Sequence, residues 1–112
     1  LGCLGLGDIG EHFPDCDPKY ANVSSGILLA ETLDLAARHG LHIDHVDMTV
    51  ICQVPKISPW KGQITKNISS LLGLSGSHVN IKATTEEHLG FTGSKKGIKA
   101  VAQVLGHRES GV

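Results

Sequence analysis

The stretch Val79-Asn-Ile-Lys-Ala-Thr-Thr-Glu-Glu-His-Leu-Gly-Phe-Thr-Gly93 combines a clear strand pattern with a dense group of polar side chains. Val79, Ile81 and Ala83 alternate with polar residues, which predicts a half-buried strand. Two threonines and two glutamates end this strand, and a glycine-containing loop follows. Hydroxyls donate hydrogen bonds to phosphate oxygens, and a carboxylate can hold a cation that the phosphates share. The stretch therefore predicts either a site for a phosphorylated ligand or, because such turns are common, a simple polar turn.

The composition around this stretch indicates one small globular domain spanning residues 1–112, of which 40% are hydrophobic. A chain of this length buries a modest core, so oligomerisation would add to its stability. Ten basic and eleven acidic residues nearly balance, which argues against a nucleic-acid or membrane surface. Cys3, Cys16 and Cys52 lack the paired spacing of a zinc ribbon and are odd in number. We interpret them as free thiols in a reducing compartment.

Two stretches carry apolar residues at helical spacing. The first runs from about Ser25 to His39 and is followed by Gly40, a typical residue after a helix end. The second begins after Ser58 and stops at Gly73. The side chains expected to face the core are Leu29, Leu33, Ala36 and Ala37 in the first helix, and Trp60, Ile64, Ile68, Leu71 and Leu72 in the second.

Two further segments have apolar residues in strand-like patterns. Residues 41–54 alternate, but the apolar phase reverses, which predicts a turn or bulge near Asp44 and His45. By pattern, residues 97–105 fit either a helix or a strand, and the tail after Gly106 is expected to fray. One-sided helices and several strands predict an α+β fold, with a mixed sheet and helices packed on one of its faces.

Two segments near the start of the chain present carboxylates in constrained backbone. In Gly7-Asp-Ile-Gly10, the flanking glycines let a ligand approach while Asp8 accepts hydrogen bonds from hydroxyls. In Phe13-Pro-Asp-Cys-Asp-Pro18, two aspartates lie between two prolines, which suits an acid/base pair or a metal site. Both segments also fit ordinary turns, in which aspartate is common.

Later in the chain, Gln53-Val-Pro-Lys-Ile-Ser58 leaves the extended segment at Pro55. Proline interrupts ladder pairing and exposes neighbouring amides and carbonyls, which can read the edge of a base. The same residues also fit a simple link between a strand and a helix.

The sequence His42-Ile-Asp-His-Val-Asp47 contains two histidines and two aspartates, which are possible metal ligands. On a strand His42 and Asp44 point to one face, and His45 and Asp47 point to the other. Two ligands on each face do not complete a zinc site, which needs three or four. We interpret this segment as a surface turn.

Four of these segments together resemble one enzyme family. Gly7–Gly10, Phe13–Pro18, Gln53–Lys56 and Val79–Gly93 resemble, in order and spacing, the 2-C-methyl-D-erythritol 2,4-cyclodiphosphate synthase family. The resemblance covers almost the whole chain but lacks the family's N-terminal third. It implies a homotrimer with active sites between subunits, and it implies that residues 97–105 form a strand. It also implies an enzyme of the non-mevalonate isoprenoid route, in the bacterial cytoplasm or a plastid.

The family reaction converts 4-diphosphocytidyl-2-C-methyl-D-erythritol 2-phosphate to the cyclic 2,4-diphosphate and releases CMP. By resemblance, Thr85 supports the transition state and is the catalytic residue, while Glu87 helps carry a magnesium or manganese ion on the diphosphate. The segment from Cys52 to Ser58 is expected to surround the cytosine. The implied substrate-binding residues are Asp8, Ile9, Gly10, Phe13, Pro14, Asp15, Cys16, Asp17, Cys52, Gln53, Val54, Pro55, Lys56, Ile57, Ser58, Thr84, Glu86 and Phe91.

Three residues depart from the family pattern. Cys16 and Glu86 stand where the family usually has threonine, which removes a good hydroxyl donor at each position. Ser94 stands where the family usually has arginine, which removes a fixed cation for an anionic ligand. Lys95 or Lys96 would replace that arginine only as a flexible point charge.

The family's zinc ligands and a phosphate-steadying histidine have no counterpart among the residues of this sequence. If residues 1–112 are the entire molecule, we expect no zinc at the family's site and little turnover. If they are part of a longer protein, we expect the ordinary cyclase. Two other functions stay open: a catalytically inactive remnant that binds cytidine nucleotides or acts as a scaffold, and an unrelated small α/β binding domain.

Overall fold

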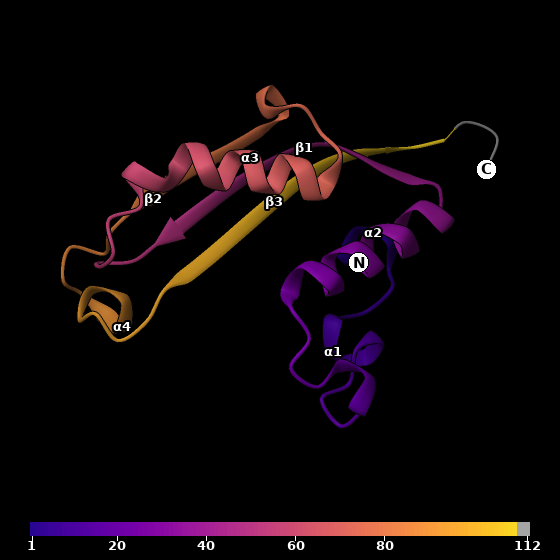
Figure 1. Ribbon diagram of the computed structural model, residues 1–112, viewed down its shortest axis with the longest axis horizontal. Helices are drawn as coiled ribbons and strands as arrows, with labels where there is room; N and C mark the ends of the chain where they lie inside the picture. Colours follow the sequence, from indigo (N-terminus) through magenta and orange to yellow (C-terminus); the bar gives the residue numbers. More distant parts are fainter. Residues whose placement is uncertain (110–112) are drawn as a thin grey trace. The chain divides into compact units, whose positions relative to one another are not determined.

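The computed structural model describes residues 1–109 and contains two compact units. Of the described residues, one unit comprises residues 1–42 and 107–109, and the other comprises residues 43–106. Figure 1 shows the course of the chain and the element labels used below.

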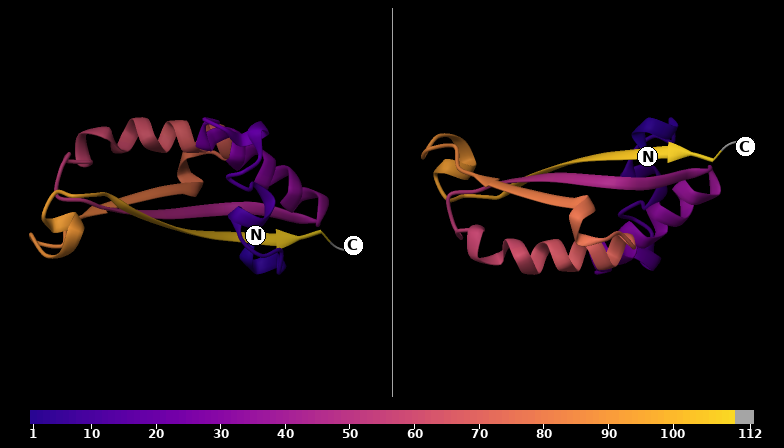
Figure 2. Two further views of the ribbon diagram at one scale, coloured as in Figure 1. Left: turned by 90° about the horizontal axis from the view of Figure 1, so that it is seen from below. Right: turned by 90° about the horizontal axis from the view of Figure 1, so that it is seen from above.

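A three-stranded sheet organises the second unit. β1 (Leu41–Ile51) is the central strand, between β2 (Val79–Thr84) and β3 (Lys99–Arg108). β1 and β2 are parallel and in register from Val46 opposite Val79 to Ile51 opposite Thr84. β3 runs in the opposite direction (Figures 1 and 2), so the sheet is mixed. The predicted α+β class with a mixed sheet is confirmed, as is the strand predicted by resemblance for residues 97–105.

One face of this sheet is covered by α3 (Lys61–Leu72), as both views in Figure 2 show. Val46, Val79 and Ile81 are buried at 5–7% exposure, whereas Asn80 and Lys82, which alternate with Val79 and Ile81 along β2, are exposed. The alternation predicted for residues 79–84 is therefore confirmed. It places an apolar face of β1 and β2 in the core.

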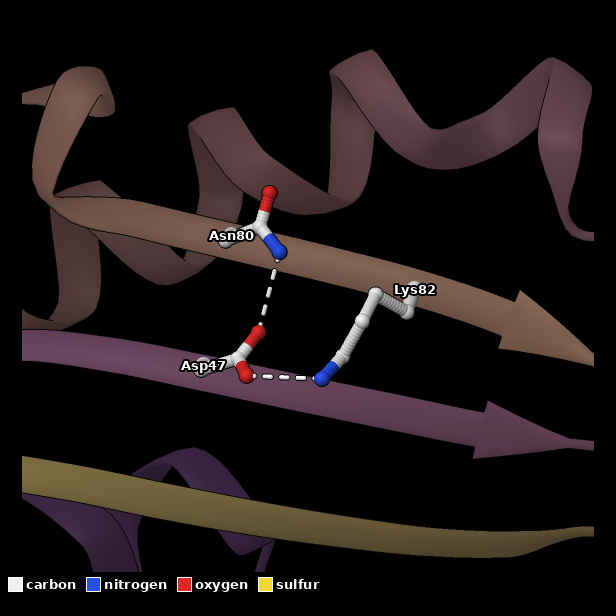
Figure 3. Close-up of polar contacts among 3 residues, drawn as sticks. All are labelled: Asp47, Asn80 and Lys82. Carbon is white, nitrogen blue, oxygen red and sulfur yellow. Dashed lines mark hydrogen bonds and ion pairs between the residues drawn. The ribbon is translucent and has the colours of Figure 1, made fainter.

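Polar side chains join β1 and β2 outside the core. The Asp47 carboxylate accepts hydrogen bonds from Lys82 Nζ at 2.8 Å and from Asn80 Nδ2 at 2.9 Å (Figure 3). These hydrogen bonds, that of Lys82 first, hold the pKa of Asp47 below its ordinary value of 3.8. The cross-strand contact links Asp47 to the residue directly opposite it and to the one two positions further along β2.

The stripe predicted for the second helix is only partly buried. Trp60 and Leu71 are 54% and 41% exposed, so the expectation that both face the core is wrong. Trp60 lies in the 3₁₀ turn Ser58–Trp60, ahead of α3, so it does not follow the α-helical spacing. Gly73 ends the helix, as predicted, and it adopts the left-handed conformation.

The extended segment ends earlier than predicted but is more regular: β1 spans Leu41–Ile51, whereas residues 41–54 were expected to be extended. Of the turn or bulge expected near Asp44 and His45, the turn is wrong, because β1 continues through both residues. The side chain at position 45 is instead accommodated by stacking on His78, with ring centroids 4.3 Å apart. The tail does not fray directly after Gly106 either: β3 continues to Arg108, and Glu109 donates a backbone hydrogen bond to Gly40. The rest of the tail lies outside the described residues.

The first unit contains α1 (Ile9–His12) and α2 (Ser25–Arg38), close to the predicted helix bounds for α2. Its buried apolar residues are Phe13, which packs edge-on against Tyr20, and Ala36. Ala37 was predicted to face the core together with Ala36, but it is exposed, so the buried face of α2 is narrower than the predicted apolar face.

A short helix, α4 (Gly90–Gly93), belongs to the second unit. No helix within residues 1–109 is long and apolar enough to cross a bilayer.

Candidate functional site

A pocket of about 330 Å³ lies where β1 and β2 end. The two strands are parallel and in register, so their carboxyl ends reach the same edge of the sheet. The Cys52 amide donates to the Thr84 carbonyl at 3.2 Å, the last link before the chains diverge. The pocket is lined by Cys52, Gln53, Pro55, Lys56, Ile57, Ser58, Ala83, Thr84 and Thr85. Two segments predicted separately from the sequence thus form one site.

The first wall of the pocket is the irregular segment that follows β1. Cys52 is 4% exposed, and its thiol donates to the Pro55 carbonyl at 3.4 Å, which holds the segment in a tight bend. Within residues 1–109, the amides of Lys56 and Ile57 form no hydrogen bond. Backbone amides without a hydrogen-bond acceptor can donate to the polar edge of a flat ring that enters the pocket.

The second wall carries the hydroxyls of Thr84 and Thr85, both exposed. Thr84 Oγ1 donates to the Thr85 carbonyl at 3.3 Å. Thr85 Oγ1 accepts from the Glu87 amide at 3.2 Å, so its own hydrogen remains available to an anionic oxygen. This arrangement suits a phosphate group lying across the strand ends.

Beyond Thr85, the chain makes a strained turn into α4. Glu87 and His88 have φ angles of 51° and 66°, in the left-handed region that non-glycine residues rarely adopt. The His88 amide donates to Gln53 Oε1 at 3.2 Å, which ties this turn to the first wall of the pocket. Thr92 is 2% exposed and anchors α4, whereas Phe91 is 56% exposed.

The predicted site residues near the start of the chain belong to the other unit. Asp8 caps α1 by accepting from the Glu11 amide at 3.0 Å, and Asp17 accepts from the Lys19 amide at 3.0 Å. Phe13 is buried and lines a separate cavity of about 410 Å³ in that unit. Ile9, Gly10, Asp15 and Cys16 are exposed, and Pro14 is half-buried. The ligand contacts expected of these residues stay predictions.

The described residues do not build a metal centre. Across residues 1–109, no three side chains of His, Cys, Asp or Glu gather closely enough to hold an ion. His42 instead pairs with Glu109, and His45 stacks on His78. The side chains of residues 1–109 therefore do not form a zinc site by themselves. Glu87 offers a single exposed carboxylate, which suits a magnesium ion held mainly by phosphate oxygens.

Two features of the site were missed in the sequence. Ala83, the residue before Thr84, also lines the pocket. Its pairing with Val50 at the end of β1 places it there. The bond from the His88 amide to Gln53 joins residues 35 positions apart, and no local pattern predicts it. His88 itself is exposed.

The chain is similar to several known proteins. A bifunctional enzyme IspD/IspF from Oleidesulfovibrio alaskensis is 58% identical over 96% of this chain and 27% of its own length. A 2-C-methyl-D-erythritol 2,4-cyclodiphosphate synthase from Agathobacter rectalis is 50% identical over 91% of this chain and 58% of its own length. A solved structure described as a CDP complex of IspF from Plasmodium falciparum is 38% identical, with a TM-score of 0.83 over 98% of this chain and 65% of that one.

The chain thus spans less than two thirds of the length of each of these relatives. Residues 1–107, which include both walls of the pocket and all three strands except the last residue of β3, match the YgbB family. On this match, the chain belongs to the YgbB family.

Proposed function

We propose that the protein is a 2-C-methyl-D-erythritol 2,4-cyclodiphosphate synthase and that its pocket binds the cytidine end of the substrate. The observation that carries this proposal is the meeting of the Cys52–Ser58 segment with Thr84 and Thr85 at one strand edge. The first wall offers backbone groups to a base, and the second offers hydroxyls to phosphates. The solved relative described as a CDP complex supports the same assignment.

In this proposal the base lies against the segment after β1. The amides of Lys56 and Ile57 pair with acceptors on the cytosine ring, and the Lys56 side chain supplies a cation near the nucleotide. Cys52 holds the bend from beneath and does not face solvent. Because the contacts come from the backbone, their positions depend on the bend and not on side-chain rotamers.

The chemical step takes place at the diphosphate. An oxygen of the substrate's 2-phosphate forms a bond to the β-phosphorus, and the bond from that phosphorus to the bridging oxygen breaks. CMP leaves with the bonding electron pair, and the cyclic diphosphate remains. The Thr85 hydroxyl donates to a phosphoryl oxygen as charge develops there, which stabilises the transition state. Glu87 would hold a magnesium or manganese ion that neutralises the diphosphate.

We further propose that the protein acts as a homotrimer, with the site completed by a neighbouring subunit. β3 is an edge strand whose residues are almost all exposed. The apolar side chains left uncovered beside or within it are Ile98, Val101, Val104 and Leu105, at 45–64% exposure. An exposed apolar edge strand is a surface for pairing with other chains. The free thiols Cys3, Cys16 and Cys52 support action in a reducing compartment such as the bacterial cytoplasm.

A second candidate is a protein that binds cytidine nucleotides without turnover. It rests on the pocket alone, since the pocket by itself accounts for nucleotide binding. This candidate shares the pocket with the cyclase but lacks the chemical step. Release of CMP therefore separates the two.

The test is to incubate the protein at its native length with 4-diphosphocytidyl-2-C-methyl-D-erythritol 2-phosphate and magnesium, and to measure CMP. We expect steady CMP release from the wild type and a loss of roughly a hundredfold or more in Thr85→Ala, since one transition-state donor is removed. Thr65→Ala on α3, away from the pocket, is the matched control and should be unaffected. CDP binding without CMP release would establish the second candidate.

A further inference from the structure

Gln53 lies in the segment expected to surround the base, but its side chain points to the other wall of the pocket. Its Oε1 accepts a hydrogen bond from the His88 amide at 3.2 Å. His88 follows Thr85, which is proposed to donate to a phosphoryl oxygen, and Glu87, which is proposed to hold the metal ion on the diphosphate. The contact therefore connects the base side of the pocket with its phosphate side.

The backbone that Gln53 holds is one that local preferences do not favour. Glu87 and His88 are consecutive non-glycine residues with φ of 51° and 66°. Residues in this region persist only when their surroundings fix them. Thr85 Oγ1 holds the Glu87 amide, and Gln53 holds the next one. These two side chains are the acceptors for two successive amides of the turn.

The opposite side of His88 is confined as well. A Cβ placed on Gly93 would lie 2.4 Å from the carbonyl carbon of His88 and 2.8 Å from its Cα. α4 thus reaches the His88 backbone only because position 93 lacks a side chain. The turn is held between α4 and the Gln53 carboxamide.

From these contacts we infer that Gln53 is a positioning residue for the phosphate side of the site and not a reader of the base. It holds the Thr85–His88 turn so that the Thr85 hydroxyl and the Glu87 carboxylate face the diphosphate. The inference rests on the proposed function for the identity of the ligand. It predicts that Gln53 contributes to binding of the diphosphate group and not to binding of the nucleoside.

The experiment compares cytidine and CDP as ligands of the protein at its native length, by calorimetric titration with magnesium present. Gln53→Met keeps the length of the side chain but removes the acceptor. We expect CDP affinity to fall roughly tenfold, the effect of one lost hydrogen bond, while cytidine affinity changes less than about twofold. Gln63→Met, an exposed glutamine on α3, is the matched control and should change neither affinity.

Amide hydrogen exchange at His88 gives a second measurement that does not depend on any ligand. Exchange should be faster in Gln53→Met and close to that of the wild type in Gln53→Glu, because a carboxylate restores the acceptor. Thermal unfolding verifies that each variant is folded.

Equal losses for cytidine and CDP would show that Gln53 contacts the base and would overturn the inference. Unchanged CDP affinity together with unchanged His88 exchange would also overturn it. If the wild type did not bind CDP, the proposed function would fail. The exchange rate of the His88 amide in Gln53→Met would then still decide whether Gln53 holds the turn.

Discussion

Replacing Gly93 with alanine is the substitution for which the structure gives the clearest expected result. The new Cβ would lie 2.4 Å from the His88 carbonyl carbon. Carbon atoms in contact are separated by about 3.5 Å, so the two backbones must move apart by roughly 1 Å. Both partners are main-chain segments, so no side-chain rotation relieves the clash.

The expected cost follows from comparison with other overpacked interiors. Forced backbone shifts of this kind cost about 1–3 kcal/mol of unfolding free energy. We expect the upper part of this range, because neighbouring Thr92 is 2% exposed and α4 cannot rotate without displacing it. For a small domain, each kcal/mol lowers the Tm by roughly 4–8 °C. The moved turn carries Glu87, so CDP affinity should fall as well.

Thermal unfolding and CDP titration of Gly93→Ala measure both effects. Gly62→Ala is the matched control, because nothing lies within 4 Å of a Cβ at that position in α3. Alanine is the better helix former, so the control should be as stable as the wild type or more stable by up to about 1 kcal/mol. A Gly93→Ala protein with unchanged Tm and unchanged CDP affinity would refute the packing described for α4 and His88.

Two further predictions concern the sheet. Ile81→Ala should lower the unfolding free energy by about 2–5 kcal/mol in urea titrations, because Ile81 is 7% exposed. Ile27 is half-exposed, so Ile27→Ala should cost much less. Similar losses in the two variants would contradict the assignment of the core. Lys82→Met should raise the pKa of Asp47 toward 3.8 in an NMR titration of the carboxyl carbon. Because the folded-state pKa is lowered, the stabilisation from this contact is present above the unfolded-state pKa and is lost as pH falls through the folded-state value. If the pKa of Asp47 is the same in the variant as in the wild type, Lys82 is not the main cause of the lowered pKa.

Several parts of the fold could be predicted because local patterns determine them. The alternation of Val79, Ile81 and Ala83 indicated which face of β2 is buried, and Gly73 marked the end of α3. The parallel register was not visible in the sequence. The polar strand end and the Pro55 bend each fitted a site or an ordinary turn, and the resemblance to the family favoured a site. The pocket arises because the register brings these two ends together.

Other features depend on contacts between distant residues. The turn expected at Asp44 and His45 does not form. His78 contacts this part of β1 instead, through Nδ1 on the Asp44 carbonyl at 3.0 Å and by stacking of its ring on His45. Trp60 was expected in the core because its spacing fits α3, but the chain at that point is a 3₁₀ turn. The link from Gln53 to His88 follows from tertiary structure alone.

The central claim is that the pocket at the carboxyl edge of β1 and β2 recognises a cytidine diphosphate. The most direct measurement is a titration of the isotopically labelled protein with CDP and with UDP, followed by amide NMR. We predict that CDP binds about tenfold more tightly than UDP, because the two bases present different donors and acceptors to the backbone. We also predict that the largest shifts fall in residues 52–58 and 84–88. Equal affinities, or shifts centred outside these two segments, would contradict the account.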